Sequence, residues 1–291
     1  MAQASGQPMG LPVVADGRDL GAALQAGDFA ITVEVLPPTG ADAEPLLGAL
    51  EAVADLPFHG FSVATNPVAR AHMSALALCA LLQARTGKPA TLHCTTRDHN
   101  RLSVQGLLWG ALALGIHSVL VTTGDYVALE AKGRTTSGRD LGVNDLVLMA
   151  RQAGLLTGVA LDPRSSGERL DHEVQRLELK ARAGAQFVVT QPVFAEVGAE
   201  RLLSATRHIG IPVLLGILPL RTARHASYLH DSIAGITVPD VVRARMESAS
   251  EPKAEGIAGA REVLRVARER SAGACIMPPF GRYEILADIM A

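Results

Sequence analysis

The strongest constraint on the fold is a repeated pattern, in which short continuous apolar runs alternate with longer segments of helical periodicity. Runs that are apolar on successive residues are typical of strands in a parallel sheet that is covered on both faces. The alternation therefore predicts βα units. Eight runs are expected to be strands, and they occupy residues 31–36, 60–64, 90–95, 118–122, 157–161, 187–191, 212–217 and 274–277.

The segment before the sixth predicted strand shows the helical half of a unit. Leu170, Val174, Leu177 and Ala181 follow one another at the spacing of a single helical face, and Gly184 provides a stop signal. We therefore expect a helix that packs its apolar stripe against the sheet.

Eight units of this kind predict an α/β protein with a closed (β/α)8 TIM barrel, and a chain of 291 residues is long enough for it. A doubly wound open sheet uses similar units, but its nucleotide site typically carries a GxGxxG turn, which this sequence lacks. Pro239 and Pro252 interrupt the stretch between the last two strands, which predicts extra helices there. We expect an irregular N-terminal segment over residues 1–28 and a single barrel domain over residues 29–291.

Composition argues against several classes of partner. The 27 basic and 29 acidic residues are dispersed and aromatic residues make up 3%, so no nucleic-acid partner is expected. Cys79, Cys94 and Cys275 have no CxxC spacing, which argues against a disulfide framework and a cysteine-rich zinc site. The start of the chain does not resemble a signal peptide and no apolar run is long enough for a membrane span, so a cytoplasmic protein without a membrane partner is expected.

Polar residues concentrate where the predicted strands end. In a barrel the loops that follow all eight strands converge on one face, so these side chains are expected to meet over a common pocket of an enzyme. They are Glu34, Thr65, Asn66, the segment 93–98, the segment 122–125, Asp162 and Gln191.

Two of these positions have competing interpretations. Glu34 lies within an apolar run, where a carboxylate is either a general acid with a raised pKa or the partner of a lysine or arginine. The Thr-Thr-Gly-Asp turn at residues 122–125 either contacts a ligand or is an ordinary Asx-type turn.

Two further groups are less informative from the residues alone. His93 and Cys94 are neighbours on a strand and point to opposite faces, so a metal site is not expected. His93 is expected to line the barrel instead. Glu173, Arg176 and Lys180 share one face of a helix, which predicts a solvent-exposed ladder of salt bridges.

Taken in order along the chain, eight segments resemble the methylenetetrahydrofolate reductase family in its short, single-domain bacterial form, from about residue 31 to the end. The segments are VEVLPP (33–38), NPVARAHMS (66–74), LHCTTRDHN (92–100), TTGD (122–125), EVQRLELKARAGAQFVVTQPVF (173–194), GILPL (216–220), GITVPD (235–240) and MPPFGRYE (277–284).

This resemblance implies a barrel that binds FAD at its carboxyl-end face. NADH or NADPH reduces the flavin, and the flavin then passes hydride to 5,10-methylenetetrahydrofolate in a ping-pong mechanism that yields 5-methyltetrahydrofolate. A homo-oligomer is also expected. The sequence leaves open which nicotinamide is used, and whether the reaction serves methionine biosynthesis or the breakdown of methyl groups.

The resemblance also implies roles for individual residues. Glu34 would protonate the folate nitrogen whose departure opens the five-membered ring. Asp125 would act between flavin and pterin, and Gln191 would bind the pterin. The positions expected to bind the cofactor are Thr65, His93, Thr123, Gly124, Asp125, Asp162, Glu173, Arg176 and Lys180, with Lys180 facing the pyrophosphate.

Three of these positions depart from the family pattern, and two other functions stay open. Thr123 stands in place of an arginine, Asp162 in place of a tyrosine and Arg176 in place of an asparagine. One alternative is a flavin-independent reductase of the same substrate, in which nicotinamide passes hydride directly to the folate. The other is a non-catalytic folate-binding subunit of a one-carbon complex.

Overall fold

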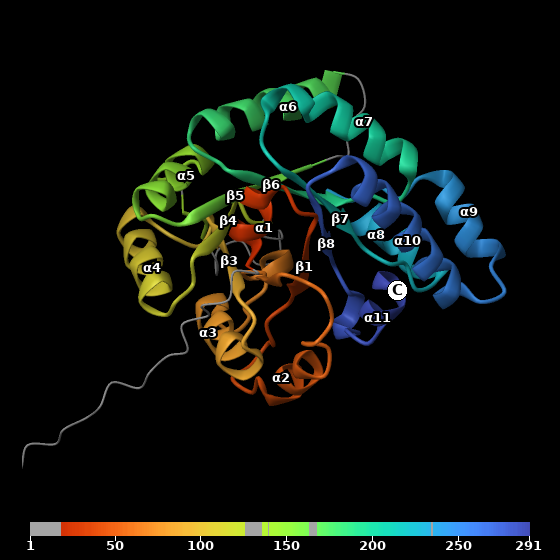
Figure 1. Ribbon diagram of the computed structural model, residues 1–291, viewed down its shortest axis with the longest axis horizontal. Coiled ribbons are helices and arrows are strands. Elements are labelled where there is room, and N and C mark those ends of the chain that lie inside the picture. Colours follow the sequence, from red (N-terminus) through yellow and green to blue (C-terminus); the bar gives the residue numbers. More distant parts are fainter. Residues whose placement is uncertain (1–18, 126–135, 139, 163–167, 234) are drawn as a thin grey trace, which may run out of the picture.

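The computed structural model describes residues 19–125, 136–138, 140–162, 168–233 and 235–291. Its eight parallel strands pair in chain order and close through β1 and β8 (Figure 1). The predicted (β/α)8 barrel is therefore confirmed, with each strand within one or two residues of its predicted position. The strands are β1 (Ala30–Val35), β2 (Gly60–Val63), β3 (Ala90–Thr95), β4 (Ser118–Thr122), β5 (Leu156–Leu161), β6 (Phe187–Pro192), β7 (Val213–Ile217) and β8 (Gly273–Ile276).

Helices lie around the outside of the strands (Figure 1). In α6, the predicted stripe residues Leu170, Val174 and Leu177 are buried against the barrel. The extra helices predicted before the last strand are α8, α9 and α10. The helices that follow the first strand are α2 (Glu44–Glu51), α3 (Ala75–Thr86), α4 (Arg101–Ala113), α5 (Val143–Gln152), α6 (Glu168–Arg182), α7 (Glu196–Thr206), α8 (Ala223–Ser232), α9 (Asp240–Ser248), α10 (Pro252–Arg270) and α11 (Ile285–Met290).

The expectation of an irregular segment over residues 1–28 is wrong for its last part, because Leu20–Ala26 form helix α1. The Asp19 side chain caps this helix by accepting a hydrogen bond from the Ala22 amide at 2.7 Å. Leu20 and Ala23 belong to the hydrophobic cluster of the barrel interior. This contact stabilises α1, and it cannot be predicted from the seven residues of the helix alone. Residues 1–18 lie outside the described part of the chain.

The barrel has one core inside the strands and a larger one between strands and helices. The inner core contains Leu120, Phe187, Leu214 and Cys275. Gly158 of β5 faces the Phe187 ring so closely that a β-carbon at residue 158 would lie 2.2 Å from a ring carbon. The inner core therefore places the large Phe187 side chain next to a position that admits only glycine.

None of the described helices combines the length and the apolar character that a membrane crossing requires.

Candidate active site

Glu34 lies near the carboxyl end of β1, opposite Ser62 of β2, and its side chain is partly exposed. Burial, with a smaller contribution from the negative charge of Asp125, raises its pKa to about 7. The charged group that acts on Glu34 within the described residues is thus a like charge, not a lysine or arginine. This environment favours the general-acid interpretation over that of a salt-bridge partner, because a substantial fraction of the carboxyl group keeps its proton at neutral pH.

The raised pKa predicts a stability effect for Glu34→Gln. The folded protein holds the Glu34 proton more tightly than the unfolded chain, so this stabilisation is complete below pH 4.5 and is lost as the pH rises through 7. We therefore expect Glu34→Gln to raise the free energy of unfolding by about 1–3 kcal/mol at pH 8 and to change it little at pH 4. Urea unfolding at the two pH values measures this difference. An equal effect at both would show that Glu34 does not titrate abnormally.

Asp125 lies at the end of the Thr-Thr-Gly-Asp turn after β4. The Gly124 amide donates to the Thr122 hydroxyl oxygen at 3.2 Å, and Gly124 adopts φ +80°, so the turn is closed locally by Thr122. Thr122, and not the Asp125 carboxylate, therefore accepts the hydrogen bond that closes the turn. The Asp125 carboxylate accepts a hydrogen bond from the Val68 amide, in the loop after β2, at 2.6 Å.

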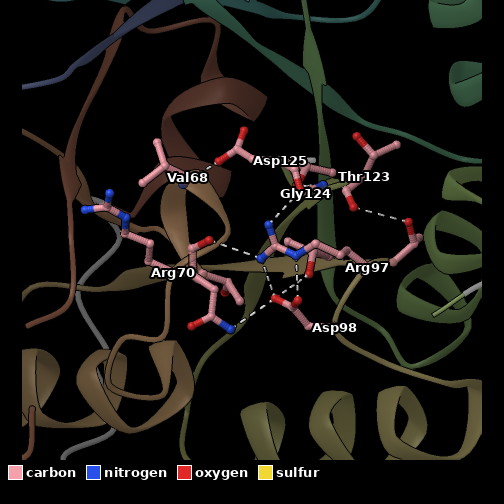
Figure 2. A network of polar contacts seen from close by, with 12 residues as sticks. Val68, Arg70, Arg97, Asp98, Thr123, Gly124 and Asp125 are labelled. Atoms are coloured by element: carbon pink, nitrogen blue, oxygen red, sulfur yellow. Dashed lines mark hydrogen bonds and ion pairs between the residues drawn. The ribbon is translucent and has the colours of Figure 1, made fainter. Parts of the chain in front are cut away.

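A buried arginine links the loops on this side of the barrel (Figure 2). The Arg97 side chain is 6% exposed and forms an ion pair with Asp98 at 2.6 Å. It also donates to the backbone carbonyl oxygens of Asp125 and Asn66. The sequence places Arg97 within the polar segment 93–98 but assigns it no role, although an Arg-Asp pair directly after a buried strand is the signal that could have indicated one.

His93 of β3 is buried inside the barrel, where its Nε2 lies 2.7 Å from the Ser62 hydroxyl. Burial lowers the pKa of His93 to about 4, so the ring is neutral at physiological pH. The Thr65 hydroxyl donates to the His93 carbonyl oxygen. Cys94 packs in the outer core instead, so the two neighbours do face opposite sides of the strand. Within the described part of the chain, no three His, Cys, Asp or Glu side chains form a group that could hold a metal ion.

Gln191 lies at a β-bulge of β6, where the register with β7 shifts between Val189 and Pro192. Gly216 permits this close approach, because a β-carbon there would lie 2.3 Å from the Thr190 carbonyl oxygen. Bulges re-aim side chains next to active sites. Gln191 is partly exposed, and its side chain forms no hydrogen bond with the described residues.

The polar face of α6 is only partly the exposed ladder that the residues alone predict. Arg176 donates to Glu173 at 2.9 Å, as expected for neighbours on a helix. Lys180 instead is buried, and its Nζ donates to the Ala160 carbonyl oxygen of β5 at 2.7 Å. Burial, with a contribution from the Arg176 charge, lowers the pKa of Lys180 to about 8. The prediction of a solvent-exposed lysine is wrong, because the long side chain reaches the strand beneath the helix.

The remaining predicted positions lie on the same carboxyl-end rim. Thr123 has an exposed side chain, and its carbonyl oxygen accepts a hydrogen bond from the Arg97 amide at 3.1 Å. Asp162 follows β5 directly and contributes a negative charge near Lys180. Two sets of predicted residues are connected by contacts. Thr123 and Asp125 both accept hydrogen bonds from Arg97, and Glu173, Arg176, Lys180 and Asp162 lie where α6 meets β5.

Comparison with known proteins identifies a matching family model and similar structures. Residues 19–275 match the family model described as methylenetetrahydrofolate reductase. A structure with a TM-score of 0.71 is titled an uncharacterized protein from Clostridium thermocellum that binds two copies of 5-methyl-5,6,7,8-tetrahydrofolic acid; it is 15% identical, with 93% of this chain and 95% of that chain covered.

More distant structures share the barrel alone. Phosphoenolpyruvate phosphomutase from Streptomyces platensis subsp. rosaceus has a TM-score of 0.54 and 18% identity, with 93% of this chain and 82% of that chain covered. At such identities the likeness concerns the fold. The family model spans far more than half of the sequence, and the chain therefore belongs to the methylenetetrahydrofolate reductase family.

Proposed function

We propose that this protein reduces 5,10-methylenetetrahydrofolate to 5-methyltetrahydrofolate, with a reduced nicotinamide nucleotide as the source of hydride. Family membership supports a reductase that acts on a folate. The similar structure from Clostridium thermocellum, which is described as binding 5-methyl-5,6,7,8-tetrahydrofolic acid, supports this substrate class. The single observation that carries the proposal is Glu34, a carboxyl group with a pKa of about 7 that lies within the electrostatic influence of Asp125.

Reduction of 5,10-methylenetetrahydrofolate requires one proton and one hydride. The protonated Glu34 donates its proton to the folate nitrogen that leaves the one-carbon unit, and the carbon–nitrogen bond breaks as that nitrogen takes the bonding electron pair. The one-carbon unit becomes an iminium cation, and hydride addition to its carbon produces the methyl group. Glu34 then recovers a proton from water, which its partial exposure permits.

Asp125 and Gln191 have the chemistry to orient the folate. A carboxylate accepts hydrogen bonds from the N–H groups of a pterin, and a side-chain amide both donates and accepts. The Asp125 charge serves a second purpose, because it favours the protonated form of Glu34 before the reaction. The Asp125 carboxylate thus links substrate binding to the protonation of Glu34.

The described contacts do not fit the predicted flavin well. A bound flavin would carry hydride between nicotinamide and folate, and its pyrophosphate would need a cation. The candidate cations of α6 are engaged, since Lys180 is buried against the Ala160 carbonyl oxygen and Arg176 pairs with Glu173. The Lys180 contact weakens the assignment of this lysine to a flavin pyrophosphate. Direct hydride transfer from nicotinamide to folate is therefore the second candidate, while FAD stays a prediction.

An absorption spectrum and a coupled assay on the purified protein test these proposals. We expect oxidation of NADH or NADPH that depends on 5,10-methylenetetrahydrofolate. A colourless protein with this activity would support direct transfer, whereas flavin absorption that bleaches under anaerobic NADH would support the FAD route. Tight binding of 5-methyltetrahydrofolate with no oxidation of either nicotinamide would refute the reductase and favour the non-catalytic folate-binding subunit.

A further inference from the structure

We propose that Arg97 is a positioning residue that holds Asp125 in place by tying together the loops that follow β2, β3 and β4. The link to folate binding rests on the proposed function, because it assumes that Asp125 contacts the substrate. The arrangement of the loops does not depend on that assumption.

The Arg97 guanidinium makes four hydrogen bonds in three directions. Its Nε and one terminal nitrogen donate to the two carboxylate oxygens of Asp98 at 2.6 and 2.7 Å. Its Nη1 donates to the Asp125 carbonyl oxygen at 2.9 Å, and Nη2 also donates to the Asn66 carbonyl oxygen at 3.1 Å. Burial raises the pKa of Asp98, but the bonds from Arg97 and Asn66 outweigh it and the pKa lies below its usual value. Asp98 is therefore a charged anchor for the guanidinium.

The loop after β2 carries backbone strain that this network restrains. Asn66 has φ +43° and Val68 has φ +49°, and a left-handed conformation is unfavourable for a β-branched residue. The Val68 amide donates to the Asp125 carboxylate at 2.6 Å, and the Asn66 side chain donates to Asp98 at 3.1 Å. The strained loop thus contacts Asp125, whose backbone carbonyl accepts a hydrogen bond from Arg97, and Asp98, the ion-pair partner of Arg97 (Figure 2).

Asp125 is consequently held at two points. Its backbone is bound by Arg97, and its carboxylate is bound by Val68, whose loop Arg97 also holds through Asn66. The turn before Asp125 packs directly on the arginine, since a β-carbon on Gly124 would lie 3.2 Å from two Arg97 carbon atoms. A planar guanidinium can serve acceptors in several directions at once, whereas the ammonium group of a lysine is a compact charge on a flexible stem.

The test uses a variant in which no buried charge is left alone, R97M/D98N. The matched control is Arg151→Met, because Arg151 also bridges a side chain and a backbone carbonyl, donating to Gln186 at 2.6 Å and to Leu155 at 3.3 Å, at the amino ends of β5 and β6. Hydrogen exchange of the amides in residues 66–70 is expected to be about tenfold faster or more in R97M/D98N and unchanged in Arg151→Met. Unchanged exchange in R97M/D98N would overturn the proposal.

Affinity for 5-methyltetrahydrofolate then separates positioning from general stability. R97M/D98N is expected to weaken binding of 5-methyltetrahydrofolate about tenfold relative to the unmodified protein. In the Asp125→Ala background the same double substitution is expected to weaken binding less than twofold, because Arg97 would act through Asp125. The same loss in both backgrounds would overturn the proposal. So would full affinity in Arg97→Lys, because charge alone would then suffice. If the unmodified protein does not bind the folate, the proposed function fails, and the exchange experiment still decides whether Arg97 holds the loops.

Discussion

Replacement of Glu34 by glutamine is expected to lower the rate of 5,10-methylenetetrahydrofolate reduction by a factor of about 100 or more, the usual contribution of one general acid. Glutamine keeps the size of the side chain and removes the proton that the leaving nitrogen needs. Steady-state kinetics measure the change. Affinity for 5-methyltetrahydrofolate, measured by titration, is expected to stay within a few-fold of the unmodified protein.

The pH profile provides an independent check on Glu34. Because the reaction needs the protonated carboxyl group and its pKa is about 7, the rate is expected to fall as the pH rises above 7. Glu34→Gln should lose this limb of the profile. The matched control is Glu44→Gln, since Glu44 pairs with Arg85 on the surface, and its kinetics should not change. A rate that rises through pH 7 in the unmodified protein, or an equal loss of binding and rate in Glu34→Gln, would contradict the assigned role.

Replacement of Gly158 by alanine is expected to reduce the free energy of unfolding by about 3 kcal/mol or more. The added β-carbon would lie 2.2 Å from the Phe187 ring, which is 1% exposed and is surrounded by the inner core of the barrel. A ring in that position can move only if its neighbours move. Urea unfolding, monitored by circular dichroism, measures the loss.

Two further variants make the explanation specific. Phe187→Leu in the Gly158→Ala background should recover part of the loss, because the smaller side chain leaves room for the methyl group. Gly48→Ala is the control, since Gly48 lies within α2 with no atom within 4 Å of the added β-carbon, and alanine should stabilise that helix by about 0.5–1 kcal/mol. If Gly158→Ala were as mild as Gly48→Ala, the inner core would be more adaptable than we infer.

Much of the architecture could be predicted from the sequence because it depends on local periodicity. Continuous apolar runs, such as Val119 to Val121, identify strands that are covered on both faces, and the stripe of α6 identifies a helix that packs on them. Eight such units and the lack of a nucleotide-binding turn were sufficient to favour a closed barrel. The carboxyl-end location of Glu34, Asp125 and Gln191 followed from the strand positions alone.

Other features depended on contacts between residues far apart in the chain. The residues alone left Glu34 either a paired carboxylate or an acid, and the three-dimensional surroundings favour the acid, because burial and the Asp125 charge both raise its pKa. Helical spacing places Lys180 on a predicted exposed face, but the length of its side chain lets it reach a carbonyl oxygen of β5. Helix α1 is another case, since its stability comes from the barrel interior that it contacts.

The sequence by itself therefore determined the order of strands and helices, the type of barrel and the rim on which polar residues gather, since each follows from the spacing of residues along a regular element. The tertiary structure alone decided the state of Glu34, the buried position of Lys180 and the role of Arg97 in joining three loops. The physical reason is that pKa values and hydrogen-bond partners depend on the distance between groups in space, and the closed barrel sets those distances.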